Sequence, residues 1–90
     1  MKIVNKDGQK EEFEDDKIFN SVYYPGLEDE LSEKEANDLA DKVVYEVKAW
    51  IADHPDNVHT SEELREKVME ILERENEDVA FLYQTHLDLN

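Results

Sequence analysis

Lys6, Lys17 and Arg65 are three cations that lie far apart along this chain. They come from three different predicted elements, so folding can bring them together. Thr60 and Ser61 stand before a predicted helix, whose start offers unpaired backbone N–H groups. Phosphate groups are bound where cations and N–H donors converge. These residues therefore favour the binding of a polyphosphate anion.

Other kinds of chemistry have much less support. The chain has no cysteine, which excludes disulfides, thiolate zinc sites and thiol catalysis. Its 3 histidines share no short spacing on one face, so we predict no metal site. No nucleophile–base pair and no Walker-type loop is present. We therefore expect no catalytic residues and no enzyme activity.

The composition limits the possible partners. The 90 residues suit a single domain, 1–90. The 25 acidic and 10 basic residues give a net charge of −15, which argues against nucleic acid and against anionic membrane surfaces. This acidity is explained either by an ordinary solvated surface or by adaptation to salt. No apolar run approaches a membrane span, and the N-terminus lacks a signal-peptide core, so we expect a cytoplasmic protein.

The N-terminal segment is predicted to be a β-hairpin with strands 2–5 and 9–13. Asp7-Gly8 is typical of a tight two-residue turn. Such a turn gives three pairs: Lys6 with Gln9, Val4 with Glu11, and Lys2 with Phe13. Val4 and Phe13 then face the core together with Glu11, whose charge either reaches water at the edge or points into a ligand site. A bulged turn would shift this register.

Four helices are expected after the hairpin. The first runs from Asp15 or Asp16 to Tyr23, where Pro25-Gly26 ends it, and residues 27–31 form a loop. The second begins at Ser32, with Glu35 completing a capping box, and it carries an apolar stripe up to residue 51. Its stripe consists of Ala36, Leu39, Ala40, Val43, Val44, Val47, Trp50 and Ile51.

The remaining elements complete the predicted fold. Val58 and His59 are predicted to form a short third strand. Thr60 or Ser61 caps the third helix, which ends near Asn76, and the last helix begins near residue 77. The predicted fold class is α+β: a small four-helix bundle capped by a β-hairpin or by a short three-stranded mixed sheet.

Three segments resemble the ATP-cone, a regulatory nucleotide-binding domain best known from ribonucleotide reductases and from the repressor of their genes. The first is KDG-QKEE-F-EDD-KI, which has the family's spacing from the Asp-Gly pair to the Lys-Ile pair. The second, HTSEELREKV, is similar to the cap and start of the family's third helix. The third, DVAFLYQTHL, is similar to its final helix. The resemblance covers the chain from Ile3 to about Leu87.

The resemblance implies a site for ATP or dATP, with Mg, between the hairpin, the first helix and the start of the third helix. The residues at matching positions are Asn5 and Lys6 near the phosphates, Glu11, Lys17, Thr60 (or Ser61 in a slipped alignment), Arg65 and His86. Simpler interpretations stay open beside this one. Lys17 could pair with an acid on its own helix, Thr60 could be only a cap, and His86 could be a core histidine.

The resemblance further implies an allosteric or oligomerisation switch without catalysis, possibly of ribonucleotide reduction. Its expected partners are an adenine nucleotide and either a second copy or a larger reductase or regulator protein. The chain would be either a stand-alone cone or an excised one. The alternative is a degenerate cone that has lost its nucleotide and acts as an interaction or oligomerisation module. Asn5, where the family has a cation, and the acidic C-terminus motivate that alternative.

Overall fold

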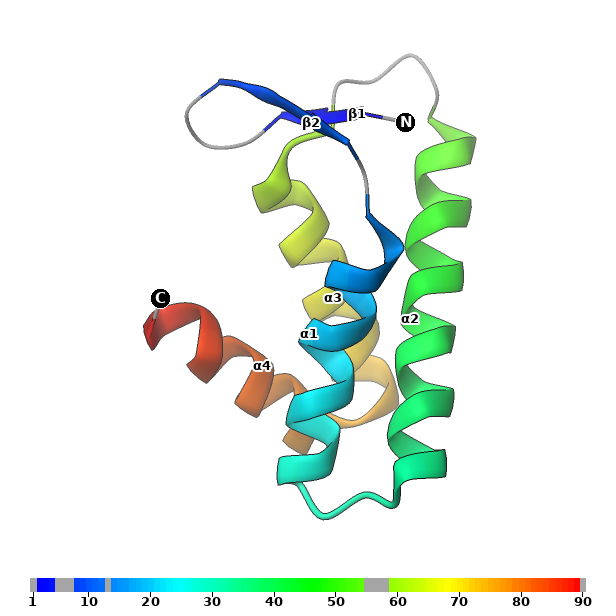
Figure 1. Cartoon of the computed structure of the whole chain (residues 1–90), viewed down its shortest axis with the longest axis vertical. Helices are drawn as coiled ribbons and strands as arrows, with labels where there is room; N and C mark the ends of the chain where they lie inside the picture. The colour runs from blue at the N-terminus through cyan, green and yellow to red at the C-terminus, as the bar shows by residue number, and fades with distance from the viewer. Residues whose placement is uncertain (1, 5–7, 13, 55–58, 90) are drawn as a thin grey trace.

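The structure is a computed structural model that describes the backbone of residues 2–4, 8–12, 14–54 and 59–89, and the side chains of these residues except 2, 4, 11, 12, 88 and 89. Within these ranges two strands and four helices follow one another (Figure 1). They are β1 (Lys2–Val4), β2 (Lys10–Glu12), α1 (Asp15–Glu28), α2 (Glu33–Asp53), α3 (Ser61–Glu75) and α4 (Glu77–Leu89).

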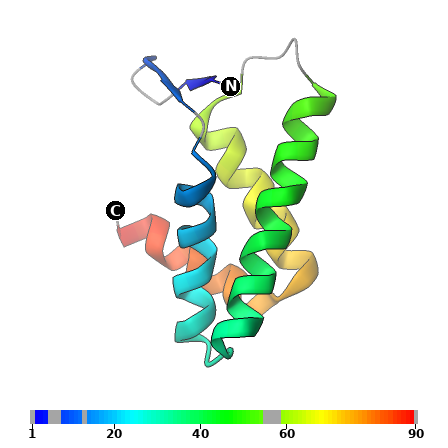
Figure 2. The same ribbon diagram turned by 45° about the vertical axis from the view of Figure 1, so that its right-hand side comes forward.

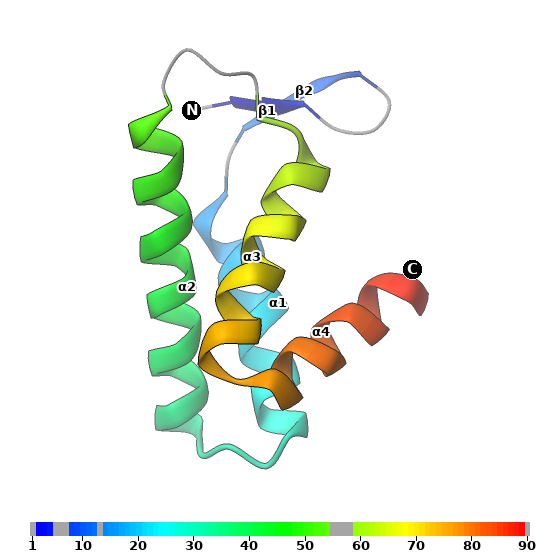
Figure 3. The same cartoon turned by 180° about the vertical axis from the view of Figure 1, so that it is seen from behind.

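The long helices α1 and α2 lie side by side and antiparallel, and α3 packs against α2 (Figures 1 and 2). The last helix, α4, packs against α1 and α3 at its start and then turns away from the bundle (Figure 3). The core lies between α1, α2, α3 and the first half of α4. Its fully buried larger side chains are Val22, Val43, Val47, Val68, Ile71, Leu72 and Val79.

The helix starts show how local sequence fixes these elements. The Ser32 hydroxyl accepts the Glu35 N–H at 3.1 Å, and the Glu35 carboxylate accepts the Ser32 N–H at 3.2 Å. The predicted capping box is thereby confirmed. Thr60 caps α3 by accepting the Glu63 N–H at 3.1 Å, as predicted. Asn76 ends α3 and caps α4, where its Oδ1 accepts two backbone N–H groups. Each cap satisfies donors that a helix start leaves unpaired.

The predicted end of the first helix is wrong, because α1 continues through Pro25-Gly26 to Glu28. The helix ends instead in a Schellman motif: the Glu30 N–H bonds to the Leu27 carbonyl at 3.0 Å, and the Leu31 N–H to the Gly26 carbonyl at 3.1 Å. Glu30 takes the left-handed conformation of this motif, with φ 67°. The left-handed position of this motif is usually glycine, and because it is glutamate here, the sequence did not indicate the true end of the helix.

Gly26 serves helix packing rather than chain reversal. It is buried, and a Cβ added there would lie 3.1 Å from Ala36 Cβ and 3.5 Å from Ala36 Cα on α2. The two small residues therefore mark a point of close approach between α1 and α2. This close contact holds Gly26 in the helix despite the low helix propensity of glycine.

The predicted fold class, α+β with a sheet capping the bundle, is also wrong. The described chain is mainly helical, and its strands have three residues each. They pair with one another in a two-stranded antiparallel ribbon at one end of the molecule, rather than forming a layer over the helices (Figure 1). The predicted third strand is not part of this ribbon in the described residues, and Val58 lies outside them.

The predicted hairpin register is wrong by one residue. The observed pairs are Lys2 with Glu12, Ile3 with Glu11, and Val4 with Lys10. Five residues separate the paired positions Val4 and Lys10. The predicted two-residue turn includes Asp7, which lies outside the described residues. Gly8 still has a positive φ, 83°. Ile3 packs against the core, whereas the side chain of Val4 and the whole of Phe13, the expected core pair, lie outside the described part of the chain.

Candidate functional site

The region where the predicted site residues would meet lies at the hairpin end and along α4. The strands lie beyond the starts of α1 and α3, and the second half of α4 projects from the bundle on one flank (Figures 1 and 3). Two hollows lie on opposite sides of this projecting half, and Leu87 of α4 contributes to the wall of both. Of the residues predicted for the site, Arg65 lines one of these hollows and His86 lines the other.

The hollow between α1 and α4 is a pocket of about 240 Å³. Its walls combine apolar and aromatic surface with hydroxyl, amide and imidazole groups. The lining residues are Asn20, Ser21, Tyr24, Pro25, Tyr83, His86 and Leu87. An apolar pocket with a few polar groups suits the base or sugar of a nucleoside better than its phosphates. Its volume is below the range of about 300–1,000 Å³ that is usual for whole ligands.

Tyr83 forms the buried wall of this pocket, 4% exposed. Burial raises the pKa of Tyr83 to about 12, while the positive charge of Arg65 and a hydrogen bond with the Ser21 side chain act in the opposite direction. Ser21 in turn donates its hydroxyl to the Ile18 carbonyl at 2.7 Å. The phenol is therefore neutral, and it joins α1 to α4 close to the Arg65 guanidinium.

His86 lies on the open side of the same pocket. Its Nε2 is 3.0 Å from the Glu28 carboxylate of α1, and both side chains are about half-exposed. Of the open interpretations, the core histidine is excluded by this exposure. The contact joins the projecting half of α4 to α1 beside the pocket.

The hollow between α3 and α4 is wider, about 440 Å³, and acidic. Among the described residues that line it, Arg65 is the single cation, and α3 also contributes three glutamates, at positions 66, 70 and 73. Like charges in a shared groove repel a polyanion. This hollow therefore suits a triphosphate less well than does the hairpin end.

Lys17 and Thr60 stand at the starts of α1 and α3, where the sequence predicts them. Lys17 is exposed and lies 3.4 Å from Glu14, one turn earlier. It also lies one turn before Asn20 of the α1–α4 pocket. The Thr60 hydroxyl accepts the Glu63 N–H, and a hydroxyl can donate one hydrogen bond as well.

The other predicted residues divide into two groups. Asn5 and Lys6 lie outside the described residues, and Glu11 is described only as a strand residue paired with Ile3. Arg65 and His86 are brought to the two sides of α4, one in each hollow. This grouping depends on the crossing of α4 over α1 and α3, which no local pattern of the sequence indicates.

His59 is a buried polar residue that the sequence analysis treated only as part of a strand. It is 4% exposed, and its Nε2 contacts the His54 carbonyl at 3.1 Å. Its ring meets the Trp50 ring edge-on, with centroids 4.8 Å apart. Nδ1 lies 3.9 Å from the Glu63 carboxylate and has no hydrogen-bond partner among the described residues. Its place directly before a helix cap, where a residue often packs inward, is the signal for this burial.

Comparison with known families gives a match over most of the chain. The model of a family described as ATP cone domain matches residues 1–84 of the 90-residue chain. The matched range contains six of the seven residues assigned to the site and stops before His86. No curated protein matches the chain. None of the described helices is long and apolar enough to cross a membrane.

Proposed function

Because this chain belongs to the ATP-cone family, whose domains are regulatory and generally bind adenine nucleotides, we propose that it binds ATP or dATP reversibly, with Mg, and performs no chemistry on it. The observation that carries this proposal is the family match over 1–84, which contains the hairpin, the start of α1 and the start of α3. In this proposal the bound nucleotide controls the activity or assembly of a larger protein, such as one of ribonucleotide reduction.

The arrangement of the described residues supports a phosphate site at the hairpin end. Lys17 is 76% exposed at its side chain, and its pair with Glu14 is also exposed. Exposed ion pairs contribute about 0–1 kcal/mol, so a phosphate can displace Glu14 at little cost. The Thr60 O–H and the open N–H groups of the α3 start supply further donors. We assign the phosphates to this end, with Asn5, Lys6 and Glu11 on the hairpin side.

The net charge of −15 opposes this binding. Mg carried by the nucleotide reduces the charge that the site must accept. Arg65 and His86, on the two sides of α4, are the groups that a bound nucleotide would reach if it extended from the hairpin end along this helix. We therefore expect Mg-nucleotide to bind more tightly than free nucleotide.

Calorimetric titration with Mg-ATP and Mg-dATP tests the proposal. We expect saturable heats with mutual competition. We also expect Lys17→Ala to weaken binding at least tenfold, since a charge-assisted contact contributes about 1.5–3 kcal/mol, which corresponds to roughly 10- to 150-fold in affinity. Lys34→Ala is the matched control, because Lys34 is another exposed lysine paired within its own helix, 3.9 Å from Asp38.

Two outcomes would contradict the proposal at different levels. If the folded chain gives no heat up to millimolar nucleotide, nucleotide binding is refuted. The remaining hypothesis is then the degenerate cone that acts as an interaction module. Equal binding by Lys17→Ala and Lys34→Ala would retain nucleotide binding and remove Lys17 from the site.

A further inference from the structure

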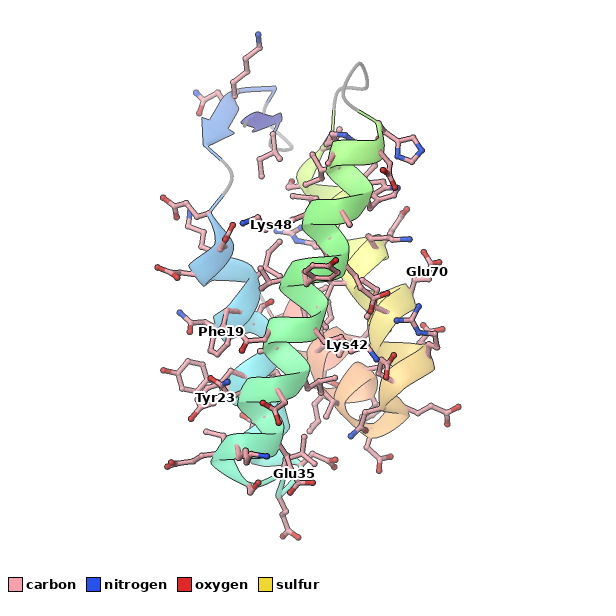
Figure 4. The ribbon with its side chains drawn as sticks, turned by 90° about the vertical axis from the view of Figure 1, so that its right-hand side faces the viewer. Phe19, Tyr23, Glu35, Lys42, Lys48 and Glu70 are labelled. Atoms are coloured by element: carbon pink, nitrogen blue, oxygen red, sulfur yellow. The ribbon has the colours of Figure 1, made fainter. Side chains whose placement is uncertain are left out.

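The outward face of α2 is the part of the described surface that the proposed nucleotide site does not use. It carries a shallow hollow of about 740 Å³, lined by Asp41, Val44, Tyr45, Lys48, Ala49 and Ala52. We call these six residues the α2 patch. Figure 4 shows α2 in front of the other helices, with Lys48 directed toward α1 and Lys42 toward α3. The patch lies between these two edges, on the side of α2 away from the core.

The α2 patch is apolar on a protein that is otherwise highly charged. Tyr45 is 75% exposed, and it is one of three large exposed hydrophobic residues among the described side chains. Val44 belongs to the predicted apolar stripe of this helix, but it is not part of the core cluster. Ala49 and Ala52, which are also exposed, have short side chains. A partner helix can therefore approach closely here.

The charges of the α2 patch are arranged symmetrically about Tyr45. Asp41 and Lys48 are seven residues apart, two turns or about 10 Å along the axis. A second α2 helix, antiparallel to the first and related by a two-fold axis near Tyr45, places each Asp41 opposite the Lys48 of the other copy. A two-fold contact needs a surface that complements itself in this way. The patch does not favour a basic partner, because the one negative and the one positive charge of the patch cancel.

We propose that the α2 patch is a self-association surface, on which two copies of this chain pair through antiparallel α2 helices. The intrachain contact of Lys48 is compatible with this pairing. Lys48 lies 3.0 Å from Asp15 at the start of α1, and an ammonium group has three donors, so it can bind both carboxylates. The proposal does not depend on nucleotide binding.

The pairing is expected to be weak. One helix face is smaller than the surface of about 800 Å² per partner that a standard interface buries. Two copies with a charge of −15 each also repel one another. At about 0.15 M salt the Debye length is ~8 Å, so charges remote from the contact are screened while the close Asp41–Lys48 contacts are not. We therefore expect dimers at high micromolar to millimolar protein.

Charge exchange between positions 41 and 48 tests the pairing by sedimentation equilibrium. D41K places like charges opposite one another in its own dimer, and so does K48D. We expect each variant alone to associate at least tenfold more weakly than the original chain. An equal mixture of the two variants restores opposite charges across both contacts, so the mixture should associate again. The double variant D41K/K48D should associate like the original chain.

Matched variants separate this surface from other causes. Tyr45→Ala should weaken association, whereas Phe81→Ala, at an aromatic residue of α4 that is 70% exposed, should not. Asp15→Ala removes the intrachain partner of Lys48 and should leave association unchanged. A chain that stays monomeric to millimolar concentration would overturn the proposal. So would a dimer that tolerates D41K and K48D, or one that Phe81→Ala breaks and Tyr45→Ala does not.

Discussion

Replacement of Glu30 by glycine should stabilise this protein. Glu30 is the only described residue other than glycine with a positive φ, 67°. The conformation is required there, because the N–H groups of Glu30 and Leu31 close the end of α1 on the carbonyls of Leu27 and Gly26. Glycine adopts this conformation without the steric conflict between Cβ and the carbonyl that other residues have.

The size of the effect follows from two opposing contributions. A left-handed conformation costs a residue with a side chain about 1–2 kcal/mol. Replacing Glu30 by glycine removes this cost, but it also stabilises the unfolded chain by roughly 0.4–1 kcal/mol, because glycine gives that chain more conformational entropy. We therefore expect Glu30→Gly to raise the free energy of unfolding by about 0.5–1 kcal/mol. For a domain of this size that is a rise of roughly 2–8 °C in Tm.

Glu30→Ala is the control, because it removes the same negative charge and keeps the conformational cost. Thermal unfolding followed by circular dichroism, together with urea midpoints, compares the two variants. Loss of a charge from an acidic chain can raise the stability of both, so the informative quantity is the difference between them. If Glu30→Gly is no more stable than Glu30→Ala, α1 does not end in this motif.

Two further predictions concern packing and burial. Gly26→Ala should lower the free energy of unfolding by up to about 2 kcal/mol, because crowding against Ala36 costs about 1–3 kcal/mol and exceeds the ~1 kcal/mol that alanine gains in a helix. In urea unfolding, we expect addition of Ala36→Gly to restore the lost stability. A Gly26→Ala variant that is more stable than the original chain would contradict the close contact. The pKa of Tyr83, raised by burial to about 12 from 10, should make stability fall as the pH rises from 10 to 12, since the unfolded phenol loses its proton first. Tyr83→Phe should lack this alkaline decline in urea midpoints, and an unchanged decline would show that another group causes it.

The sequence was a good guide where neighbouring residues decide the structure. Ser32, Thr60 and Asn76 act on N–H groups two or three residues away, so the starts of α2, α3 and α4 follow from local chemistry. The pattern around Pro25 and Gly26 predicted the wrong end for α1, because a contact with α2 determines the conformation there. Local signals favour a turn at Gly26, and the close approach of Ala36 outweighs them.

The hairpin and the site show the same limit. Asp7-Gly8 is typical of a two-residue turn, yet the observed strand pairing differs by one residue from the register that such a turn predicts, and Ile3 packs against the core. Lys17 and Thr60 could be placed from the sequence because they belong to helix starts. The grouping of Arg65 with Tyr83 depends on the crossing of α4, which no spacing along the chain encodes.

The attachment of α4 suggests how a ligand could act on this fold. Val79, Ala80 and Tyr83 bury the first half of α4, whereas its second half is held by half-buried Leu87 and by the exposed contact of His86 with α1. Breaking an exposed side-chain contact costs about 0–1 kcal/mol even when both groups are charged, so the end of α4 can move at far lower cost than α2, whose buried face spans the core. A ligand shifts such an equilibrium only by its difference in affinity for the two states. A difference of about 1.4 kcal/mol would change the population ratio of two α4 positions tenfold, so contacts with one or two groups beside α4 would be sufficient for a switch.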